Sequence, residues 1–585
     1  MRRDTQLVLP QIVVSSYLAF SPLPLRAVVF CYPHINSRLS VLSTAHCSFL
    51  SGLSSDCSAI KSLVRAQKYT FSSIFAPRKE KVTDMFKNFR GFNLVEDFLN
   101  KYYERWTHPS NAVKNAIKLG IVLVITLFVW NMPADWFGME GITVVQQRLI
   151  AIFAFAMLMW ILEVIPAWAT SVVVIGLLLL FTSDSGIGPM CDKEVVGPLL
   201  SYKAVMATFA DPVVMLFIGG FILAIAATKT GLDAQLAKIL LEPFGKKSEN
   251  VLLGFLLITG LFSMFISNTA TAAMMLTFLA PVFRQLPESG KGRIAMALAI
   301  PVAANLGGMG TPIGTPPNTI AIKYLNDPDG LNLGIGFGEW MLFMFPLVIV
   351  LLFLSWFIIK KMFPFTQKTV ELKIESKPHK GWHTTIVAVT FILTVLLWLT
   401  DSFTGINSYT VAIIPFVIFA LTGVIHRRDL EEINWSVIWM VAGGFALGYG
   451  LNASGLASLA VKSIPFGNFS PIVILIISGL ICYALSNFIS NSATAALLMP
   501  ILAVVCTAMG DKLDVIGGTS TVLIGVAIAA SSAMILPIST PPNALAFGTN
   551  LVPQKDMSKI GAIVGVLSMV LGYGVLYLIG TFHLI

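Results

Sequence analysis

Charged residues are scarce in this 585-residue sequence: Asp, Glu, Lys and Arg together make up 12% of it, against 56% hydrophobic residues. Soluble domains carry about 25% charged residues, so this composition excludes an ordinary soluble protein and indicates a polytopic membrane protein. The net charge of +9 does not indicate nucleic-acid binding, because Lys and Arg fall in short segments between apolar runs. That distribution is typical of membrane topology.

Several chemical signatures are also missing. The six cysteines show no Cys-x-x-Cys spacing, so they indicate neither a metal site nor a disulfide framework. No Gly-rich lysine loop of the Walker type occurs, which excludes ATP as the energy source. The seven histidines lie in expected loops or at the ends of apolar runs. An intramembrane enzyme with Ser267 or Ser490 as nucleophile would therefore lack a base within a span, and we expect no enzyme.

The first 84 residues differ in composition from the rest. They hold ten Lys and Arg residues, many serines and three of the six cysteines, and no apolar run there reaches the roughly 20 residues that a span needs. Two interpretations remain open: a basic, Ser-rich targeting extension, or upstream sequence from a misassigned start, with Met85 opening the protein. We favour the second, and expect disorder over residues 1–84 in either case. Residues 85–114 are expected to form an amphipathic segment at the membrane surface.

Apolar runs of membrane-spanning length fill the rest of the sequence. Eleven of them lie near residues 115–131, 147–166, 168–182, 204–240, 295–325, 338–360, 384–400, 408–424, 434–460, 518–550 and 559–582. Two further apolar stretches, 251–283 and 468–505, carry a polar motif near the middle. Each is long enough for two half-spans, so we expect two re-entrant helical hairpins, whose irregular backbone must be buried or line a cavity. The predicted fold is an all-α polytopic membrane protein with about 11 transmembrane helices plus these hairpins.

The polar motifs of the two hairpins are nearly identical. The sequence SNTATAA at 267–273 recurs as SNSATAA at 490–496, 223 residues later. The segment Thr-Pro-Pro-Asn at 315–318 recurs at 540–543, 225 residues later, and a Gly-Gly-Phe segment recurs with an offset of 224. Preserved order and spacing indicate an internal duplication. The paired glycines, Gly219-Gly220 and Gly443-Gly444, are expected to be close-packing or kink sites rather than ligands.

Loop charge orients the two repeats. The first repeat, residues 115–360, has Lys and Arg on both sides of its hairpin, whereas the hairpin of the second repeat, 384–585, is flanked by Lys462 and by the acidic segment 511–514. Because Lys and Arg accumulate on the cytoplasmic side, the first hairpin should enter from the cytoplasm and the second from outside. The linker 361–383 should then be cytoplasmic. Inverted repeats with broken helices that meet at the midplane are typical of secondary transporters.

The residue types in the motifs indicate an ion site. Ser263 precedes Ser267 by four residues, and Ser486 precedes Ser490 likewise, so each pair is expected to face one side of a helix. Pro and Gly in the two Pro-Pro-Asn segments should unwind the spans and expose carbonyl oxygens. Such oxygens suit Na⁺ better than a transition metal, and the N-termini of half-helices suit an anion. Because neither motif contains Lys or Arg, the pattern favours cation-coupled anion uptake.

With these motifs, the sequence resembles the divalent anion/sodium symporter family over residues 115–585. The resemblance implies a homodimer in which each protomer moves a transport domain against a scaffold like an elevator, with C4 dicarboxylates such as succinate, or citrate or sulfate, as substrates. It also implies two sets of site residues. Substrate would be bound by Ser267, Asn268, Thr269, Thr315, Ser490, Asn491, Ser492 and Thr540. Sodium ions would be bound by Ser263, Asn268, Gly314, Ser486, Asn491 and Ser539.

The resemblance has one departure and leaves alternatives open. The second motif has Ser492 where the family has Thr, which keeps the hydroxyl and removes a methyl group, so the choice of substrate stays open. A sodium-independent dicarboxylate exchanger, a sulfate or citrate transporter on the same fold and a passive anion channel remain alternatives. The expected location is the plasma (inner) membrane, multi-pass, with a cytoplasmic N-terminus. Expected partners are Na⁺, a small dicarboxylate, the lipid bilayer and a second copy of the chain, but no nucleic acid. Structural roles, at helix ends or in pairs, are expected for Glu163, Asp211, Lys229 and Asp233.

Overall fold

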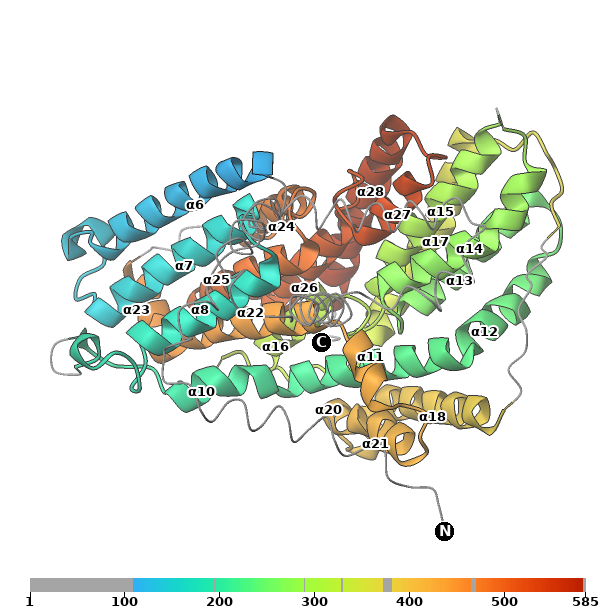
Figure 1. The fold of residues 1–585 in the computed structure, drawn as a ribbon. Coiled ribbons are helices and arrows are strands. Elements are labelled where there is room, and N and C mark those ends of the chain that lie inside the picture. The colour runs from blue at the N-terminus through green and yellow to red at the C-terminus, as the bar shows by residue number, and fades with distance from the viewer. Residues whose placement is uncertain are drawn as a thin grey trace, which may run out of the picture. The chain divides into compact units, whose positions relative to one another are not determined.

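A computed structural model describes residues 109–192, 196–288, 290–327, 330–371, 381–463 and 470–581. The expected extension over residues 1–84 and most of the amphipathic segment 85–114 lie outside these ranges. In the described ranges the chain forms helices and two isolated β-bridges but no strand (Figure 1). Seven of these helices are long and apolar enough to cross a membrane, and five shorter apolar helices accompany them. The prediction of an all-helical polytopic membrane protein is therefore confirmed.

From α11 in the first repeat and α22 in the second, the helices follow one another in the same order. The first repeat contains α6 (Pro109–Trp130), α7 (Val144–Leu162), α8 (Ala167–Phe181), α10 (Tyr202–Ala207), α11 (Pro212–Thr230), α12 (Leu232–Leu241), α13 (Ser248–Ser263), α14 (Asn268–Gln285), α15 (Lys291–Gly308), α16 (Pro316–Leu325) and α17 (Phe337–Met362). The second contains α18 (Trp382–Leu399), α19 (Asp401–Thr404), α20 (Ser408–Val411), α21 (Ile413–Leu421), α22 (Trp435–Ala453), α23 (Leu456–Ser463), α24 (Pro471–Ser486), α25 (Asn491–Met509), α26 (Gly518–Ser532), α27 (Pro541–Gly548) and α28 (Gln554–Thr581).

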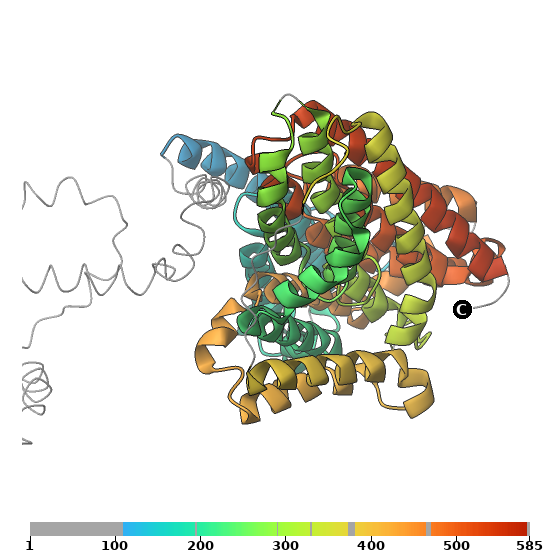
Figure 2. The same ribbon diagram turned by 90° about the vertical axis from the view of Figure 1, so that its right-hand side faces the viewer.

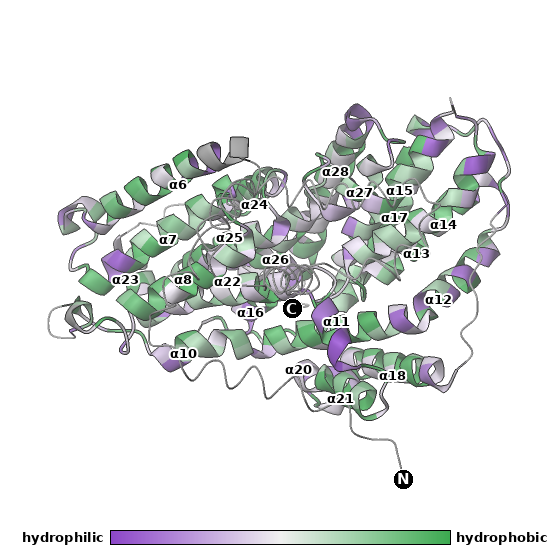
Figure 3. Cartoon of the chain, viewed as in Figure 1, coloured by the Kyte–Doolittle hydropathy of each residue, from purple (hydrophilic) through white to green (hydrophobic). Residues whose placement is uncertain are grey.

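Hydrophobic residues predominate along most helices (Figure 3). Large apolar side chains remain exposed along several helices, as expected for surfaces that face lipid. On α6 and α18 these include Ile117, Val124, Leu127, Phe128, Val389, Ile392 and Leu396. By contrast, α15 and α26 are buried along almost their whole length. Small residues allow this close approach: a Cβ atom at Gly307 of α15 would lie 2.2 Å from the carbonyl oxygen of Gly260 in α13. These two helices form the centre against which the hairpins pack.

Two of the expected spans are interrupted by a glycine. The run 204–240 is not one span, because Gly231 adopts a left-handed φ of +67° between α11 and α12. In the second repeat the run 434–460 is interrupted by Gly455, with a φ of +74°, between α22 and α23. Glycine populates this region without the steric cost that a Cβ atom brings. Both repeats therefore end the corresponding long helix at the same place in the duplicated sequence.

The two duplicated motifs form helical hairpins. In α13–α14 and in α24–α25, two helices are joined by four non-helical residues, 264–267 and 487–490. The expectation that Ser263 and Ser267 share one helix face is wrong, because Ser263 ends α13 and Ser267 is the N-cap of α14. It is wrong for the second pair too, because Ser486 ends α24 and Ser490 is the N-cap of α25. The hydroxyl of Ser267 accepts a hydrogen bond from the backbone N–H of Ala270, a bond that starts a new helix instead of continuing the old one.

The hairpins pack across the repeat boundary. Within each repeat the first hairpin helix packs on the central helix, α13 on α15 and α24 on α26. The second hairpin helix packs on the same central helix and also on the short broken helix of the other repeat, α14 on α27 and α25 on α16. Figure 2, viewed from the side of α13, α14, α15 and α17, shows these first-repeat helices side by side. Each hairpin thus packs against helices that flank the breaks of both repeats.

Candidate functional site

The tip of the first hairpin gathers oxygen atoms around one hydroxyl hydrogen. Ser263 Oγ lies 2.6 Å from Asn268 Oδ1 and 2.7 Å from the carbonyl oxygen of Ala304 in α15. Both neighbours are acceptors, and a serine hydroxyl can donate to only one of them. Ser263 is fully buried, and its hydroxyl has two acceptors for one hydrogen. The Ala304 carbonyl oxygen, which lies inside α15, also accepts the helical hydrogen bond from Gly308. The three hard oxygens form a set that suits Na⁺.

Two glycines bring the break between α15 and α16 against this tip. A Cβ atom at Gly308 would lie 2.7 Å from Asn268 Oδ1, and one at Gly314 would lie 2.4 Å from the carbonyl oxygen of Gly308. The hydroxyl of Thr311 also donates to the carbonyl oxygen of Met264 in the hairpin turn. The structure therefore brings together all three residues of the first predicted sodium site, Ser263, Asn268 and Gly314.

The second hairpin tip has free acceptors instead of a shared hydrogen. Ser486 Oγ and Asn491 Oδ1 are buried atoms with no hydrogen-bond partner in the described part of the chain. Ser539 reaches the same tip through Asn487: its hydroxyl lies 2.9 Å from the Asn487 carbonyl oxygen and 3.2 Å from Asn487 Oδ1. Buried polar atoms without partners are costly, so a ligand that satisfies them is favoured here. Ser486, Asn491 and Ser539 thus lie at one tip, with Asn487 as the link.

The asparagines of the two Pro-Pro-Asn segments hold the breaks together. Asn318 Nδ2 lies within hydrogen-bond distance of three carbonyl oxygens, those of Gly308 (3.0 Å), Met309 (3.3 Å) and Thr311 (2.8 Å). Asn543 Nδ2 likewise lies 2.8 Å from the Met534 carbonyl oxygen and 3.0 Å from that of Leu536. The expectation that unwinding leaves these carbonyl oxygens exposed is therefore corrected. An amide side chain satisfies them, as buried backbone groups require.

The predicted substrate residues lie at helix N-termini. Ser267 caps α14, and Ser490 caps α25 with its hydroxyl 3.2 Å from the Ala493 nitrogen. Asn268, Thr269, Asn491 and Ser492 form the first turns of these helices, and Thr315 and Thr540 precede α16 and α27. Thr269 and Ser490 are exposed, whereas Thr315 and Thr540 are 4% exposed. Four helix N-termini with exposed and buried hydroxyls suit an anion with acceptor oxygens at both ends.

Three groups that contribute to the candidate site were not predicted from the sequence: the Ala304 carbonyl, Asn305 and Asn487. Asn305 Nδ2 in α15 donates to Thr540 Oγ1 at 3.1 Å and to Asn543 Oδ1 at 3.2 Å. Asn487 accepts from the backbone N–H of Ile535 at 2.8 Å. An amide in the middle of an apolar run is a signal that could have identified both asparagines. A backbone carbonyl has no such signal in a sequence.

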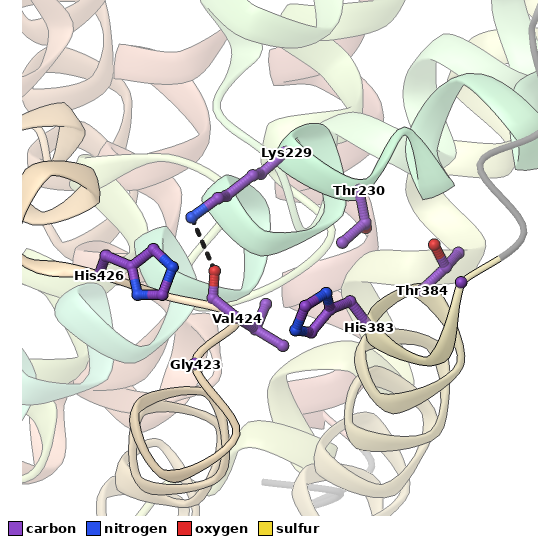
Figure 4. A pocket seen from close by; sticks show the side chains of 8 residues that line it. Lys229, Thr230, His383, Thr384, Gly423, Val424 and His426 are labelled. Carbon is purple, nitrogen blue, oxygen red and sulfur yellow. Dashed lines mark hydrogen bonds between the residues drawn. The ribbon is translucent and has the colours of Figure 1, made fainter.

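A separate cavity of about 280 Å³ lies where α11 and α21 end and α18 begins (Figure 4). It is lined by Lys229, Thr230, Gly381, His383, Thr384, Gly423, Val424 and His426. Lys229 Nζ donates to the Val424 carbonyl oxygen and pairs with Asp429 at 2.5 Å. Burial would raise the pKa of Asp429, but hydrogen bonds from Lys229 and from the backbone N–H of His426 outweigh it and lower the pKa. No residue of the duplicated motifs lines this cavity, so it is not part of the candidate site.

The structural roles expected for the remaining charged residues are confirmed. Asp211 caps α11 and pairs with Lys323 at 3.2 Å, and Asp233 accepts a hydrogen bond from the Thr228 hydroxyl at 2.9 Å. Glu163 is the C-cap residue of α7.

The paired glycines are close-packing sites, as predicted. A Cβ atom at Gly219 would lie 2.3 Å from the carbonyl oxygen of Ala412, and one at Gly443 would lie 2.4 Å from the Cβ atom of Ser171. A side chain at either position would separate the two helices that meet there.

A model of the sodium:sulfate symporter transmembrane region matches residues 113–582. The chain belongs to this family. It is therefore a membrane transporter and not an enzyme. The sodium-dependent dicarboxylate transporter SdcS of Staphylococcus saprophyticus is 30% identical over 498 residues, which cover 78% of this chain and 90% of that protein. The transporter of the same name from Staphylococcus aureus is 30% identical over 531 residues, covering 83% and 96%.

The YdaH transporter of Alcanivorax borkumensis superposes with a TM-score of 0.46 at 14% identity, covering 65% of this chain and 88% of YdaH. MtrF of Neisseria gonorrhoeae superposes with a TM-score of 0.45 at 12% identity, covering 71% and 94%.

Proposed function

We propose that this protein is a sodium-coupled symporter of dicarboxylates such as succinate. The observation that carries the proposal is the cluster of acceptor oxygens at the two hairpin tips. The Ser263 hydroxyl lies between Asn268 Oδ1 and the Ala304 carbonyl oxygen, and Ser486 and Asn491 have acceptors without partners in the described residues. Na⁺ satisfies such oxygens, and its charge replaces the Lys or Arg that an anion site otherwise uses. The relatives named sodium-dependent dicarboxylate transporters support the same substrate class.

In this proposal Na⁺ binds first and the anion second. Sodium ions are held by Ser263, Asn268 and Gly314 at one tip and by Ser486, Asn491 and Ser539 at the other. The two ends of the dicarboxylate are then bound by two sets of hydroxyl and amide groups. The first set is Ser267, Asn268, Thr269 and Thr315, and the second is Ser490, Asn491, Ser492 and Thr540. Because both sets lie at helix N-termini, backbone N–H groups and the positive helix ends add to the attraction.

We also propose a specific membrane topology and assembly for this transporter. It comprises about 11 transmembrane helices and two re-entrant hairpins in inverted repeats, 115–360 and 384–585, joined by the cytoplasmic linker 361–383. The chain forms a homodimer in the plasma (inner) membrane, with its N-terminus in the cytoplasm. The crossed packing of α14 on α27 and of α25 on α16 supports a transport domain built from both repeats.

Alternating access by an elevator-type movement is supported by a difference in packing between equivalent residues. Gly220 of α11 and Gly444 of α22 are repeat-related, but they face different parts of the hairpin assembly. A Cβ atom at Gly444 would lie 2.9 Å from the Cβ atom of Ala496 in the second hairpin, and one at Gly220 would lie 3.1 Å from Ile313 in the first break. The α16–α25 pair therefore packs against α11 and α22.

The equivalents of the two packed residues are exposed on the surface of the described chain. Ala273 of the first hairpin, the counterpart of Ala496, is exposed, and Ile538, the counterpart of Ile313, is 66% exposed. Because the repeats are inverted, the opposite state of the transporter would exchange these contacts. The α14–α27 pair would then be packed, and the α16–α25 pair would be exposed. The described arrangement is then the state that opens on the side from which the first hairpin enters.

Uptake of labelled succinate, citrate and sulfate into proteoliposomes tests the function. Succinate should accumulate above its equilibrium level when an inward Na⁺ gradient is imposed, and choline in place of Na⁺ should abolish this. Equal exchange with and without Na⁺ would identify a sodium-independent exchanger and contradict the proposal. Sulfate is the second candidate substrate, because the matching family model is named for sodium:sulfate symporters, and preferential uptake of sulfate or citrate would reassign the substrate.

A further inference from the structure

One contact between the repeats has no counterpart on the other side. Asn305, which is 2% exposed, donates from Nδ2 to Thr540 Oγ1 (3.1 Å) and to Asn543 Oδ1 (3.2 Å). The two Pro-Pro-Asn segments align with an offset of 225 residues, which places Ala530 at the position equivalent to Asn305. Alanine can donate no side-chain hydrogen bond. The duplicated site is therefore not symmetrical at this point.

The effect of this difference is visible in the two equivalent asparagines. Asn543 Oδ1 accepts the hydrogen bond from Asn305. Asn318 Oδ1, its counterpart in the first repeat, is buried without a hydrogen-bond partner in the described part of the chain. The equivalent amide oxygen thus has a hydrogen-bond partner in the second repeat and none in the described part of the first.

The two equivalent threonines differ in the same way. Thr540 Oγ1 accepts hydrogen bonds from Asn305 Nδ2 and from the backbone N–H of Asn543 at 3.3 Å. A threonine hydroxyl has two acceptor positions and one hydrogen, so Thr540 is left able only to donate. Thr315 makes no side-chain capping bond at the start of α16, and residue 530 offers it no amide. Its hydroxyl is free to rotate between donating and accepting.

We propose that Asn305 is a positioning residue that fixes the Thr540 hydroxyl as a hydrogen-bond donor to the transported anion. This inference rests on the proposed function, in which Thr540 contacts the substrate. The second-repeat end of the site is thereby rigid and selects an acceptor oxygen, such as that of an ionised carboxylate or a sulfate. The first-repeat end, with Thr315, adapts to the other end of the substrate.

A double-mutant cycle on the full-length protein tests this assignment. Initial uptake of labelled succinate would be measured in proteoliposomes at saturating Na⁺ for wild type, Asn305→Ala, Thr540→Val and the double variant. We expect each single variant to raise KM about tenfold, the effect of one lost hydrogen bond to a charged partner. The double variant should have the KM of Thr540→Val alone, because Asn305 acts through that hydroxyl.

The matched control is a second mutant cycle, in which the partner position is Thr315, a residue that Asn305 does not contact. In the cycle of Asn305→Ala with Thr315→Val, the two increases in KM should multiply. If the two increases in KM also multiply in the cycle with Thr540, Asn305 only supports the packing of α15 on α27. That result would overturn the inference. A KM of Asn305→Ala equal to that of wild type would overturn it too.

An isosteric variant covers the case in which Asn305→Ala does not fold, as judged by gel filtration. Asn305→Asp keeps the shape of the side chain but presents acceptors, so the Thr540 hydroxyl turns to donate to the new carboxylate. Its KM should rise at least as much as that of Asn305→Ala, and an unchanged KM would contradict the inference. Should the wild-type protein transport none of the three anions, the proposed function itself fails, which is distinct from a failure of the cycle.

Discussion

Ser263 Oγ lies 2.6 Å from Asn268 Oδ1 at the tip of the first hairpin, whereas the repeat-related atoms of Ser486 and Asn491 have no hydrogen-bond partner in the described residues. The two tips share a sequence motif but start from different hydrogen-bonding states. In the first, an ion must displace an existing bond. In the second, it meets oxygen atoms that already lack partners.

The two serines should therefore differ in their effect on stability. Without Na⁺, Ser263→Ala should lower the free energy of unfolding by about 1–3 kcal/mol, because it leaves buried acceptors without a donor. Ser486→Ala should change it by less than about 0.5 kcal/mol, because it removes a group that makes no bond. Thermal unfolding of the purified variants in detergent measures this. In saturating Na⁺, Ser486→Ala should lose part of the stabilisation that wild type gains from the bound ion. Equal losses for both variants without Na⁺ would contradict the asymmetry.

The motif asparagines should be nearly indispensable for transport. Asn268→Ala and Asn491→Ala each remove a side chain assigned to both an ion and the substrate, so initial uptake should fall to a few per cent of wild type or less, a loss of about 2–4 kcal/mol in transition-state stabilisation. Uptake rates at matched expression provide the measurement, with Asn452→Ala, in α22 outside both motifs, as a control that should stay active. Wild-type rates for both motif variants would place the site elsewhere.

The departure at Ser492 should affect selectivity more than mechanism. Ser492→Thr restores one methyl group, which is worth roughly 1–3 kcal/mol of discrimination in a pocket, so the ratio of succinate to citrate uptake should change while transport persists. Ser492→Ala should lose more activity, since the partner of the hydroxyl is left without a bond at about 1–3 kcal/mol. Competition of citrate against labelled succinate gives the ratio. An unchanged ratio in Ser492→Thr would remove this residue from the substrate pocket.

The two equivalent alanines should exchange their accessibility during transport. In the described state a cysteine at Ala273 should react with a water-soluble thiol reagent, and one at Ala496, which is 1% exposed, should be protected. Conditions that favour the opposite state should protect position 273 and expose position 496. Labelling rates would be compared in a background without the native cysteines. Protection of Ala496→Cys under every condition tested, with Ala273→Cys always reactive, would argue against exchange of the two packed pairs.

The inverted topology has a direct test. Loop charge predicts that Lys291, the first residue of α15, lies in the cytoplasm and that Lys512, after α25, lies outside. Single cysteines at these positions should therefore be labelled from opposite faces by an impermeant reagent applied to intact cells and to inverted vesicles. Labelling of both from one face is incompatible with inverted repeats.

The sequence by itself determined the class of protein, the duplication and the location of the hairpins. Hydropathy is a local property, and the repeated SNTATAA and SNSATAA motifs keep their spacing whatever the fold. The proline and glycine positions also located the helix breaks. Several spans therefore agree with the observed helices to within a few residues, whereas others are split into shorter helices, among them 295–325 and 518–550 at the Pro-Pro-Asn breaks and the two runs that Gly231 and Gly455 interrupt.

Only the tertiary structure decided how the repeats meet. The bond from Asn305 to Thr540 joins residues 235 positions apart, and no periodicity within either repeat predicts it. Likewise Ala273 and Ala496 occupy the same place in the same motif, yet one is exposed and the other is buried against α22. The reason is physical: burial and hydrogen bonding depend on the neighbours that packing supplies, and the two copies of the motif have different neighbours in the folded chain.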